Sequence, residues 1–257
     1  MVIRAWMRML RLPNLALIAC TQWLVYLAIM QPVLAEDAGA STLSFWTLVI
    51  ATLLVCASGN VINNIFDRDL DAADPRLALI PVHFSLRQSW WLYGLLVVLG
   101  AAWTGWIAWS NGYVHSWWLY PAACGLLFSY SAKLKCTPLA GNLLVAAMTM
   151  AVIGIIPYAY WDPLEALRQN DPSYWATLIY KLIMLFLFAG VTNLAREVIK
   201  DLEDMDTDRV AGCASTAAYF GASTGKAFGL MIWSAVIIMA ASALWFLSSA
   251  ASVWLAL

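Results

Sequence analysis

Residues 44–76 read SFWTLVIATLLVCASGNVINNIFDRDLDAADPR, an apolar run that ends in a cluster of asparagine and aspartate residues. The apolar part, residues 44–66, is long enough to cross a bilayer as a helix, because about 20 such residues span roughly 30 Å of hydrocarbon. We therefore predict a membrane-spanning helix over 44–66 that carries oxygen-bearing side chains at its end.

Similar apolar stretches recur along the rest of the 257-residue chain, which is 63% hydrophobic and only 11% charged. This composition excludes an ordinary soluble globule, in which about a quarter of the residues are charged. Further spans are predicted near residues 14–34, 89–109, 114–131, 139–158 and 177–199. The 31 uncharged residues after Lys226 have room for one full span and part of a second. We expect one all-α domain over 1–257, a polytopic transmembrane helical bundle of seven to eight spans.

Most basic residues gather on one side of this predicted bundle. If the loops alternate between the two faces, 12 of the 14 Lys and Arg residues share the side of the amino terminus. Because cytoplasmic loops are enriched in Lys and Arg, we expect the amino terminus and these loops to be cytoplasmic. The first span is expected to stay in place rather than be cleaved as a signal peptide, because further spans follow it. A formal net charge of −1 gives no reason to expect nucleic acid as a partner.

The cysteines and histidines form no recognisable metal or disulfide pattern. The five cysteines are scattered without C-x-x-C spacing or neighbouring histidines, at Cys20, Cys56, Cys124, Cys136 and Cys213. We therefore expect packing or lipid-facing cysteines rather than disulfides or thiolate ligands. Neither His83 nor His115 belongs to a metal-ligand pair, and His83 is expected in a solvated loop.

Two short windows, 60–76 and 196–209, hold 10 of the 15 acidic residues, each following a predicted span. In the first window, Asn63, Asp67 and Asp71 recur every four residues and therefore lie along one face of a helix. Aligned carboxylates destabilise a helix unless a cation offsets their charge. The stripe formed by Asn63, Asp67 and Asp71 therefore predicts a bound metal ion. Oxygen-only ligands favour a hard cation, Mg²⁺ before Zn²⁺.

The second window repeats this spacing with Asp204 and Asp208, while Asp201 lies three residues upstream. DRDLD (67–71) and DMDTD (204–208) also match the opening of a calcium-binding EF-hand loop. Both lack the turn glycine and the later bidentate glutamate of that loop, so this alternative is disfavoured. The three aspartates are therefore predicted as a second set of Mg²⁺ ligands.

Two carboxylate sets predict a diphosphate substrate bridged by Mg²⁺, which binds proteins through a few carboxylates together with substrate phosphates. Basic residues among the acids are candidate phosphate contacts, either as ligands or only as topology signals: Arg68, Arg76, Lys133, Lys135, Arg196 and Lys200. A metal-diphosphate site beside a membrane-buried apolar cavity fits an isoprenyl diphosphate. Aromatic faces near the reacting carbon would stabilise positive charge, with Tyr130 and Phe66 as candidates.

Three motifs in order resemble those of the UbiA-type intramembrane prenyltransferases. NNIFDRDLD (63–71) looks like that family's N-D-x-x-D-x-x-x-D signature, with Asn64 in place of the usual Asp. DMDTD (204–208) followed by GCAST (212–216) looks like its D-x-x-x-D motif ahead of G-x-x-(S/T)-T. YSAKLKCTPLAGN (130–142) is similar to its Tyr-Ser, Leu-Lys and Gly-Asn stretch.

This resemblance implies a helical bundle around a central cavity and Mg²⁺-dependent transfer of a prenyl group from an isoprenyl diphosphate. It implies that Mg²⁺ and diphosphate are held by Asn63, Asp67, Asp71, Asp204 and Asp208, with Asp201, Lys135 and Arg196 as helpers. Residues 196–204, REVIKDLED, look closest to the branch that uses geranylgeranyl diphosphate to alkylate geranylgeranylglyceryl phosphate. An aromatic quinone precursor is the alternative acceptor. Nine spans are typical of the family, so the chain is expected to lack the last helix.

A divalent-cation transporter or channel is the alternative of a different class, because acidic residues near membrane spans often line ion pathways. A pore would place acids within the spans. The predicted spans are almost free of them, which favours the transferase.

Overall fold

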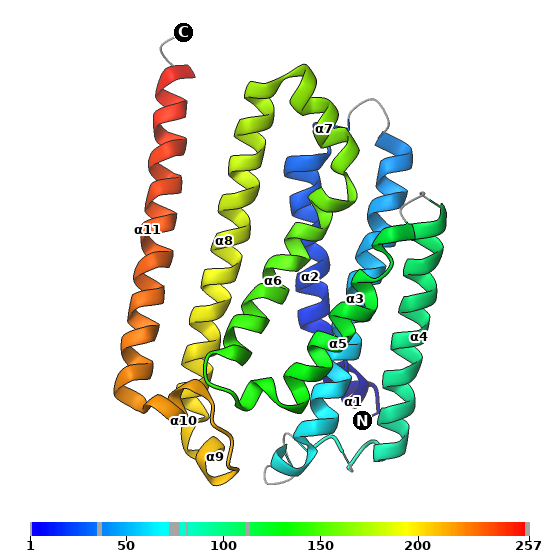
Figure 1. Cartoon of the computed structure of the whole chain (residues 1–257), viewed down its shortest axis with the longest axis vertical. Helices are drawn as coiled ribbons and strands as arrows, with labels where there is room; N and C mark the ends of the chain where they lie inside the picture. Colours follow the sequence, from blue (N-terminus) through cyan, green and yellow to red (C-terminus); the bar gives the residue numbers. More distant parts are fainter. Residues whose placement is uncertain (1, 35–37, 72–77, 81, 111–113, 255–257) are drawn as a thin grey trace. The chain divides into compact units, whose positions relative to one another are not determined.

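The structure is a computed structural model that describes residues 2–34, 38–71, 78–80, 82–110 and 114–254. Its elements are all helical within these ranges (Figure 1). The longer helices are α1 (Val2–Met9), α2 (Leu12–Val25), α3 (Ala38–Asp71), α4 (Leu86–Ser110), α5 (Leu119–Ala132), α6 (Ala140–Ala159), α7 (Trp161–Asn170), α8 (Pro172–Glu203) and α11 (Ala222–Trp254). The short ones are η1 (Tyr26–Met30), η2 (Val114–Ser116), η3 (Leu134–Cys136), α9 (Met205–Val210) and α10 (Thr216–Phe220). The predicted all-α fold class is confirmed.

Six helical segments in the described part of the chain are long and apolar enough to cross a membrane. They are Leu12–Met30, Ser44–Asp69, Leu86–Ser110, Ala140–Ala159, Pro172–Glu203 and Ala222–Ala241. The structure differs from the sequence prediction at two places. The segment predicted as a span over 114–131 contains only the 14-residue helix α5, which rises about 21 Å and falls short of the hydrocarbon thickness. The carboxyl-terminal stretch forms one continuous helix, α11, instead of one span and part of another.

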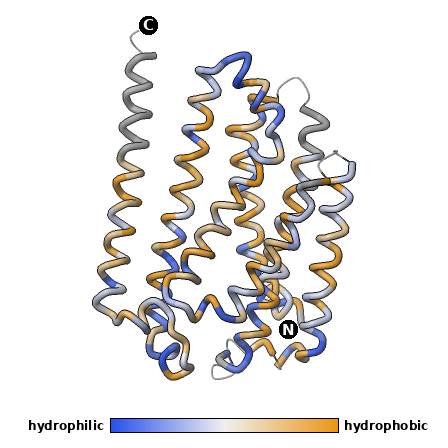
Figure 2. Tube along the Cα trace, in the orientation of Figure 1, coloured by the Kyte–Doolittle hydropathy of each residue, from blue (hydrophilic) through white to orange (hydrophobic). Residues whose placement is uncertain are grey.

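The chain divides into two compact units, and one of the boundaries between them lies inside α6, between Ala151 and Val152. Unit 1 comprises residues 1–134 and 152–172, and unit 2 comprises residues 135–151 and 173–257. In each unit, polar residues concentrate at helix ends, at the last turns of α3 in unit 1 and around α9 in unit 2 (Figure 2). The first acidic window therefore belongs to unit 1 and the second to unit 2.

Unit 1 is built around α3, which contacts α1, α2, α4 and α5. Its core at the polar end of α3 contains eight buried residues: Ala5, Met9, Val61, Ile62, Ile65, Leu79, Ile80 and Phe84. A capping box starts α4, where the Ser85 N–H donates to Gln88 Oε1 and the Gln88 N–H donates to Ser85 Oγ. These contacts hold α1 and the start of α4 against the segment of α3 that carries Asn63 and Asp67.

In unit 2, α8 and α11 run side by side through contacts of Ala195 and Val198 with Ile232 (Figure 1). A disulfide joins Cys136 of η3 to Cys213, 77 residues later. The expectation that the cysteines form no disulfide is therefore wrong for this pair, because folding brings together two segments that are distant in sequence. The other three cysteines are free thiols.

Candidate functional site

The stripe predicted in the first window is present on α3. The Asn63 amide Nδ2 donates a 2.7 Å hydrogen bond to Asp67 Oδ2, one helical turn further on, and Asp71 ends the helix after another turn. Both Asn63 and Asp67 are half-buried. Because the hydrogen bond uses the amide nitrogen of Asn63, the amide oxygen and the carboxylate are the atoms suited to a cation.

Asn64 lies on a different face of α3 and has a structural role. Its amide donates to the carbonyl oxygens of Met9 (3.2 Å) and Asn60 (2.7 Å), while the Asn60 amide donates to the Leu10 carbonyl at 2.8 Å. Carbonyls at the end of a helix lack partners within the helix, so these two amides cap the carboxyl end of α1. An ionised carboxylate cannot donate such bonds, which explains asparagine at this position.

The other first-window candidates are placed as follows. Arg68 pairs through Nε with the exposed Asp69 at 3.3 Å, so its guanidinium lies along the end of its own helix. Phe66 makes edge-on contacts with Phe128 (5.5 Å between ring centres) and Trp90 (6.5 Å). Two candidates remain: Tyr130 is half-buried on α5, and Arg76 lies outside the described residues.

The second window is not one continuous helix. The helix α8 ends at Glu203, Asp204 adopts the bridge region of the backbone (φ −90°, ψ −1°), and α9 starts at Met205. The one-turn spacing of Asp204 and Asp208 nevertheless survives, because the Asp208 N–H donates to the Asp204 carbonyl at 2.8 Å. The predicted single helical face is therefore correct for these two aspartates, whereas Asp201 belongs to the preceding helix.

Electrostatics distinguish Asp208 among the second-window acids. Burial raises the pKa of its carboxyl above the ordinary value, and the negative charges of Asp204 and Asp201 raise this pKa further. The Ser215 side chain and, more weakly, the positive charge of Lys135 lower the pKa of Asp208. An added cation would stabilise ionised Asp208 against its burial and its acidic neighbours.

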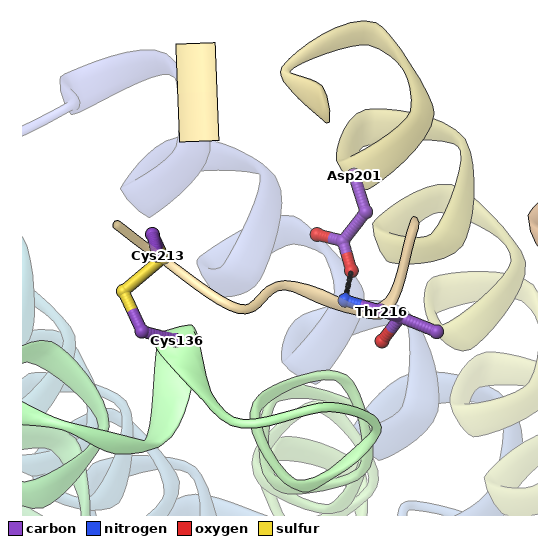
Figure 3. The surroundings of a disulfide bond; sticks show 4 residues. All are labelled: Cys136, Asp201, Cys213 and Thr216. Atoms are coloured by element: carbon purple, nitrogen blue, oxygen red, sulfur yellow. Dashed lines mark hydrogen bonds between the residues drawn. A yellow bond between two sulfur atoms is a disulfide. The ribbon is translucent and has the colours of Figure 1, made fainter. Parts of the chain in front are cut away.

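Asp201 is part of a hydrogen-bond network at the end of α8. Its Oδ2 accepts 3.0 Å bonds from the Thr216 N–H, drawn in Figure 3, and from the Asn142 amide. Asn142 and Thr216 stand in two of the motifs, but the sequence alone assigned neither of them a role. The Thr216 hydroxyl donates to Asn142 Oδ1 at 2.8 Å across 74 residues, so the two motifs meet in the fold.

Two further basic candidates, Arg196 and Lys200, lie on α8. Arg196 is exposed and forms an ion pair at 2.6 Å with the buried Glu197, so one of its nitrogens is already engaged. Lys200 is exposed, and its backbone carbonyl accepts the Asp204 N–H at 2.9 Å.

Within the described part of the chain, no three acidic, histidine or cysteine side chains come close enough together to hold a metal ion by themselves. The donors present are carboxylate and amide oxygens, which suit a hard cation such as Mg²⁺. Such an ion commonly takes one or two protein carboxylates and completes its shell with water and substrate phosphates. The residues present therefore fit Mg²⁺ bound together with a phosphate-bearing substrate.

Comparison with known proteins places the chain in a family. Residues 22–257 match the sequence model of the UbiA prenyltransferase family. The chain belongs to this family. Together with the apolar helices, this membership identifies an integral membrane protein.

Two relatives are each named Digeranylgeranylglyceryl phosphate synthase. The one from Thermococcus sibiricus is 27% identical over 197 residues, which cover 74% of this chain and 61% of the relative. The one from Natronomonas pharaonis is 32% identical over 181 residues, covering 67% of this chain and 56% of the relative. The aligned region thus spans about three fifths of the length of these relatives.

A solved structure described as "Structural and mechanistic insights into the biosynthesis of Digeranylgeranylglyceryl phosphate synthase in membranes" has the same fold. It superposes with a TM-score of 0.61 at 20% identity and covers 93% of this chain and 76% of the other. At this identity the likeness establishes the shared fold.

Proposed function

We propose that this protein transfers a prenyl group from an isoprenyl diphosphate to a lipid acceptor, with Mg²⁺ as cofactor. The similarity to digeranylgeranylglyceryl phosphate synthases supports geranylgeranyl diphosphate as donor and geranylgeranylglyceryl phosphate as acceptor. We place the reaction on the cytoplasmic side of the membrane, together with the amino terminus.

The observation that carries this proposal is the same arrangement of oxygen ligands at two helix ends. In unit 1, Asn63 and Asp67 are one helical turn apart and joined by a hydrogen bond. In unit 2, Asp204 and Asp208 are also one turn apart, joined through the backbone. Each pair offers few enough ligands for a cation to bind diphosphate oxygens as well.

In the proposed function, Asn63, Asp67 and Asp71 bind Mg²⁺ and diphosphate oxygens, and Asp204 and Asp208 have the same role. Bound Mg²⁺ would neutralise charge that develops on the diphosphate leaving group. The side chains of Lys135, Arg196 and Lys200 supply further positive charge toward phosphate oxygens.

Phe66 and the aromatic rings in contact with it also have a proposed role. Phe66 follows Asn63 by three residues, so it flanks the stripe on the surface of α3. Its contacts with Trp90 and Phe128 build an apolar aromatic group beside Asp67. Such rings stabilise a cation-like allylic carbon and keep water from reacting with it.

The decisive experiment measures diphosphate release and prenylated lipid with the purified full chain, geranylgeranyl diphosphate, geranylgeranylglyceryl phosphate and Mg²⁺. Asp67→Asn and Asp204→Asn should each lower turnover by about 100-fold or more, because each removes charge stabilisation of the leaving group. Asp69→Asn and Asp206→Asn are matched controls, since both residues are exposed acids in the same windows.

The controls should retain activity close to that of the unmodified protein. Equal turnover in Asp67→Asn and in Asp69→Asn would remove the assignment of the stripe to the active site. Prenylation of an aromatic acceptor in place of the glyceryl lipid would reassign the acceptor. Absence of turnover with any prenyl donor, together with Mg²⁺ flux into liposomes, would favour the transporter.

A further inference from the structure

The carboxylate of Asp201 is engaged by two donors that come from different segments of unit 2. Both bonds end on Oδ2, one from the Thr216 N–H and one from the Asn142 amide, each at 3.0 Å. Thr216 is completely buried, and Asn142 is 6% exposed. Two hydrogen bonds to Oδ2 stabilise the charge of the carboxylate and occupy the lone pairs of that one oxygen.

The network closes on itself through the Thr216 hydroxyl. This hydroxyl donates to Asn142 Oδ1 at 2.8 Å and accepts the Leu139 N–H at 3.0 Å. Leu139 has a positive φ of 60°, which is uncommon for a residue other than glycine and is held by the surrounding contacts. Leu139, Asn142, Asp201 and Thr216 thus form one connected unit.

A covalent bond joins the same two segments. The disulfide links Cys136, three residues before Leu139, to Cys213, three residues before Thr216 (Figure 3). The end of α8, the 135–142 segment and the 211–216 segment are therefore held together by side-chain, backbone and covalent contacts. The Cys213 N–H also donates to the Asp208 carbonyl at 2.8 Å.

These contacts determine where the second pair of proposed ligands lies. Asp204 and Asp208 fall between Asp201 and Thr216 in the sequence, and the bond from Thr216 to Asp201 joins the two ends of that segment, which are 15 residues apart. Lys135 precedes Cys136 directly and acts electrostatically on Asp208. The network thus holds both the acidic pair and its basic neighbour.

We propose that Asp201 is a positioning residue, which closes the loop that presents Asp204 and Asp208, and is not itself a Mg²⁺ ligand. This inference rests on the proposed function and refines the ligand set predicted from the sequence. A hydrogen-bond acceptor is what this position requires, and the side-chain oxygen of asparagine accepts the same two bonds without carrying charge.

The test compares Asp201→Asn with Asp201→Ala in the full chain. Hydrogen–deuterium exchange of the 211–217 peptide is measured without Mg²⁺ or substrate. Asp201→Ala should exchange about 10-fold or more faster, because Thr216 loses its acceptor, whereas Asp201→Asn should stay close to the unmodified protein. Asp206→Asn, an exposed acid in α9, is the matched control and should leave exchange unchanged.

The second readout is turnover as a function of Mg²⁺ concentration. Asp201→Asn should keep turnover within about threefold and leave the half-saturating Mg²⁺ concentration unchanged, while Asp204→Asn loses turnover by about 100-fold or more. Normal exchange in Asp201→Asn together with a loss as large as that of Asp204→Asn would overturn the proposal and make Asp201 a ligand.

Failure of the proposed function is distinguishable from failure of this inference. If the unmodified protein shows no prenyl transfer, the function is refuted, and exchange alone then decides whether Asp201 organises the loop. Unchanged exchange in Asp201→Ala would refute the positioning role even in a fully active enzyme.

Discussion

Restoring the aspartate that the family usually carries at position 64 should destabilise this protein. Asn64 is 8% exposed and donates to the carbonyls of Met9 and Asn60. Asn64→Asp removes both donors and buries a carboxyl group beside two carbonyl oxygens. An unsatisfied buried polar group costs about 1–3 kcal/mol, and burial of the acid adds to it, so we expect a loss of about 2–5 kcal/mol.

The assay is thermal unfolding of the purified protein in one detergent or nanodisc preparation. A chain of this size loses about 2–4 °C of Tm per kcal/mol, so the Tm of Asn64→Asp should fall by about 4–20 °C. Asp69→Asn changes one charge on the exposed face of the same helix and should leave Tm unchanged within about 1 °C. An unaltered Tm in Asn64→Asp, or a gain in Mg²⁺-dependent turnover, would refute a capping role and make residue 64 a ligand.

Two further predictions concern packing and covalent structure. Alkylation of the denatured chain should label three cysteines without reductant and five after reduction. Cys136→Ser or Cys213→Ser should lower the free energy of unfolding by up to about 4.5 kcal/mol, given the length of the loop that the disulfide closes. Five labelled thiols without reductant would contradict the disulfide. Gly100→Ala should destabilise the folded protein by about 1–3 kcal/mol, because an added Cβ would meet the Tyr120 hydroxyl. Gly94→Ala is the control, since an added Cβ at that position meets no neighbouring atom. Equal Tm values for the two glycine variants would exclude that contact.

The sequence predicted most of the helices because hydropathy and length are local properties. Five predicted spans overlap helices of spanning length, among them 44–66 within Ser44–Asp69 and 177–199 within Pro172–Glu203. It did not predict the short α5, because an apolar composition alone does not show where a helix starts. The short 3-10 helix η2 (Val114–Ser116) precedes α5, which starts only at Leu119.

The first acidic stripe could also be read from the sequence, since a spacing of four residues places Asn63 and Asp67 in contact on any α-helix. The same argument holds for Asp204 and Asp208, which lie one turn apart, but it did not reveal that Asn142 and Thr216 bond to Asp201. Spacing describes which face a residue lies on, and it does not describe which partners approach that face.

By itself, then, the sequence determined an apolar helical protein with oxygen-bearing stripes at two helix ends, because both features repeat over a few residues. Tertiary structure decided the roles of individual polar residues. Asn64 caps a helix that lies 55 residues away, and Asp201 meets Asn142 across 59 residues and Thr216 across 15. Hydrogen bonds and a disulfide over such separations depend on where the folded chain returns, and no local periodicity encodes that path.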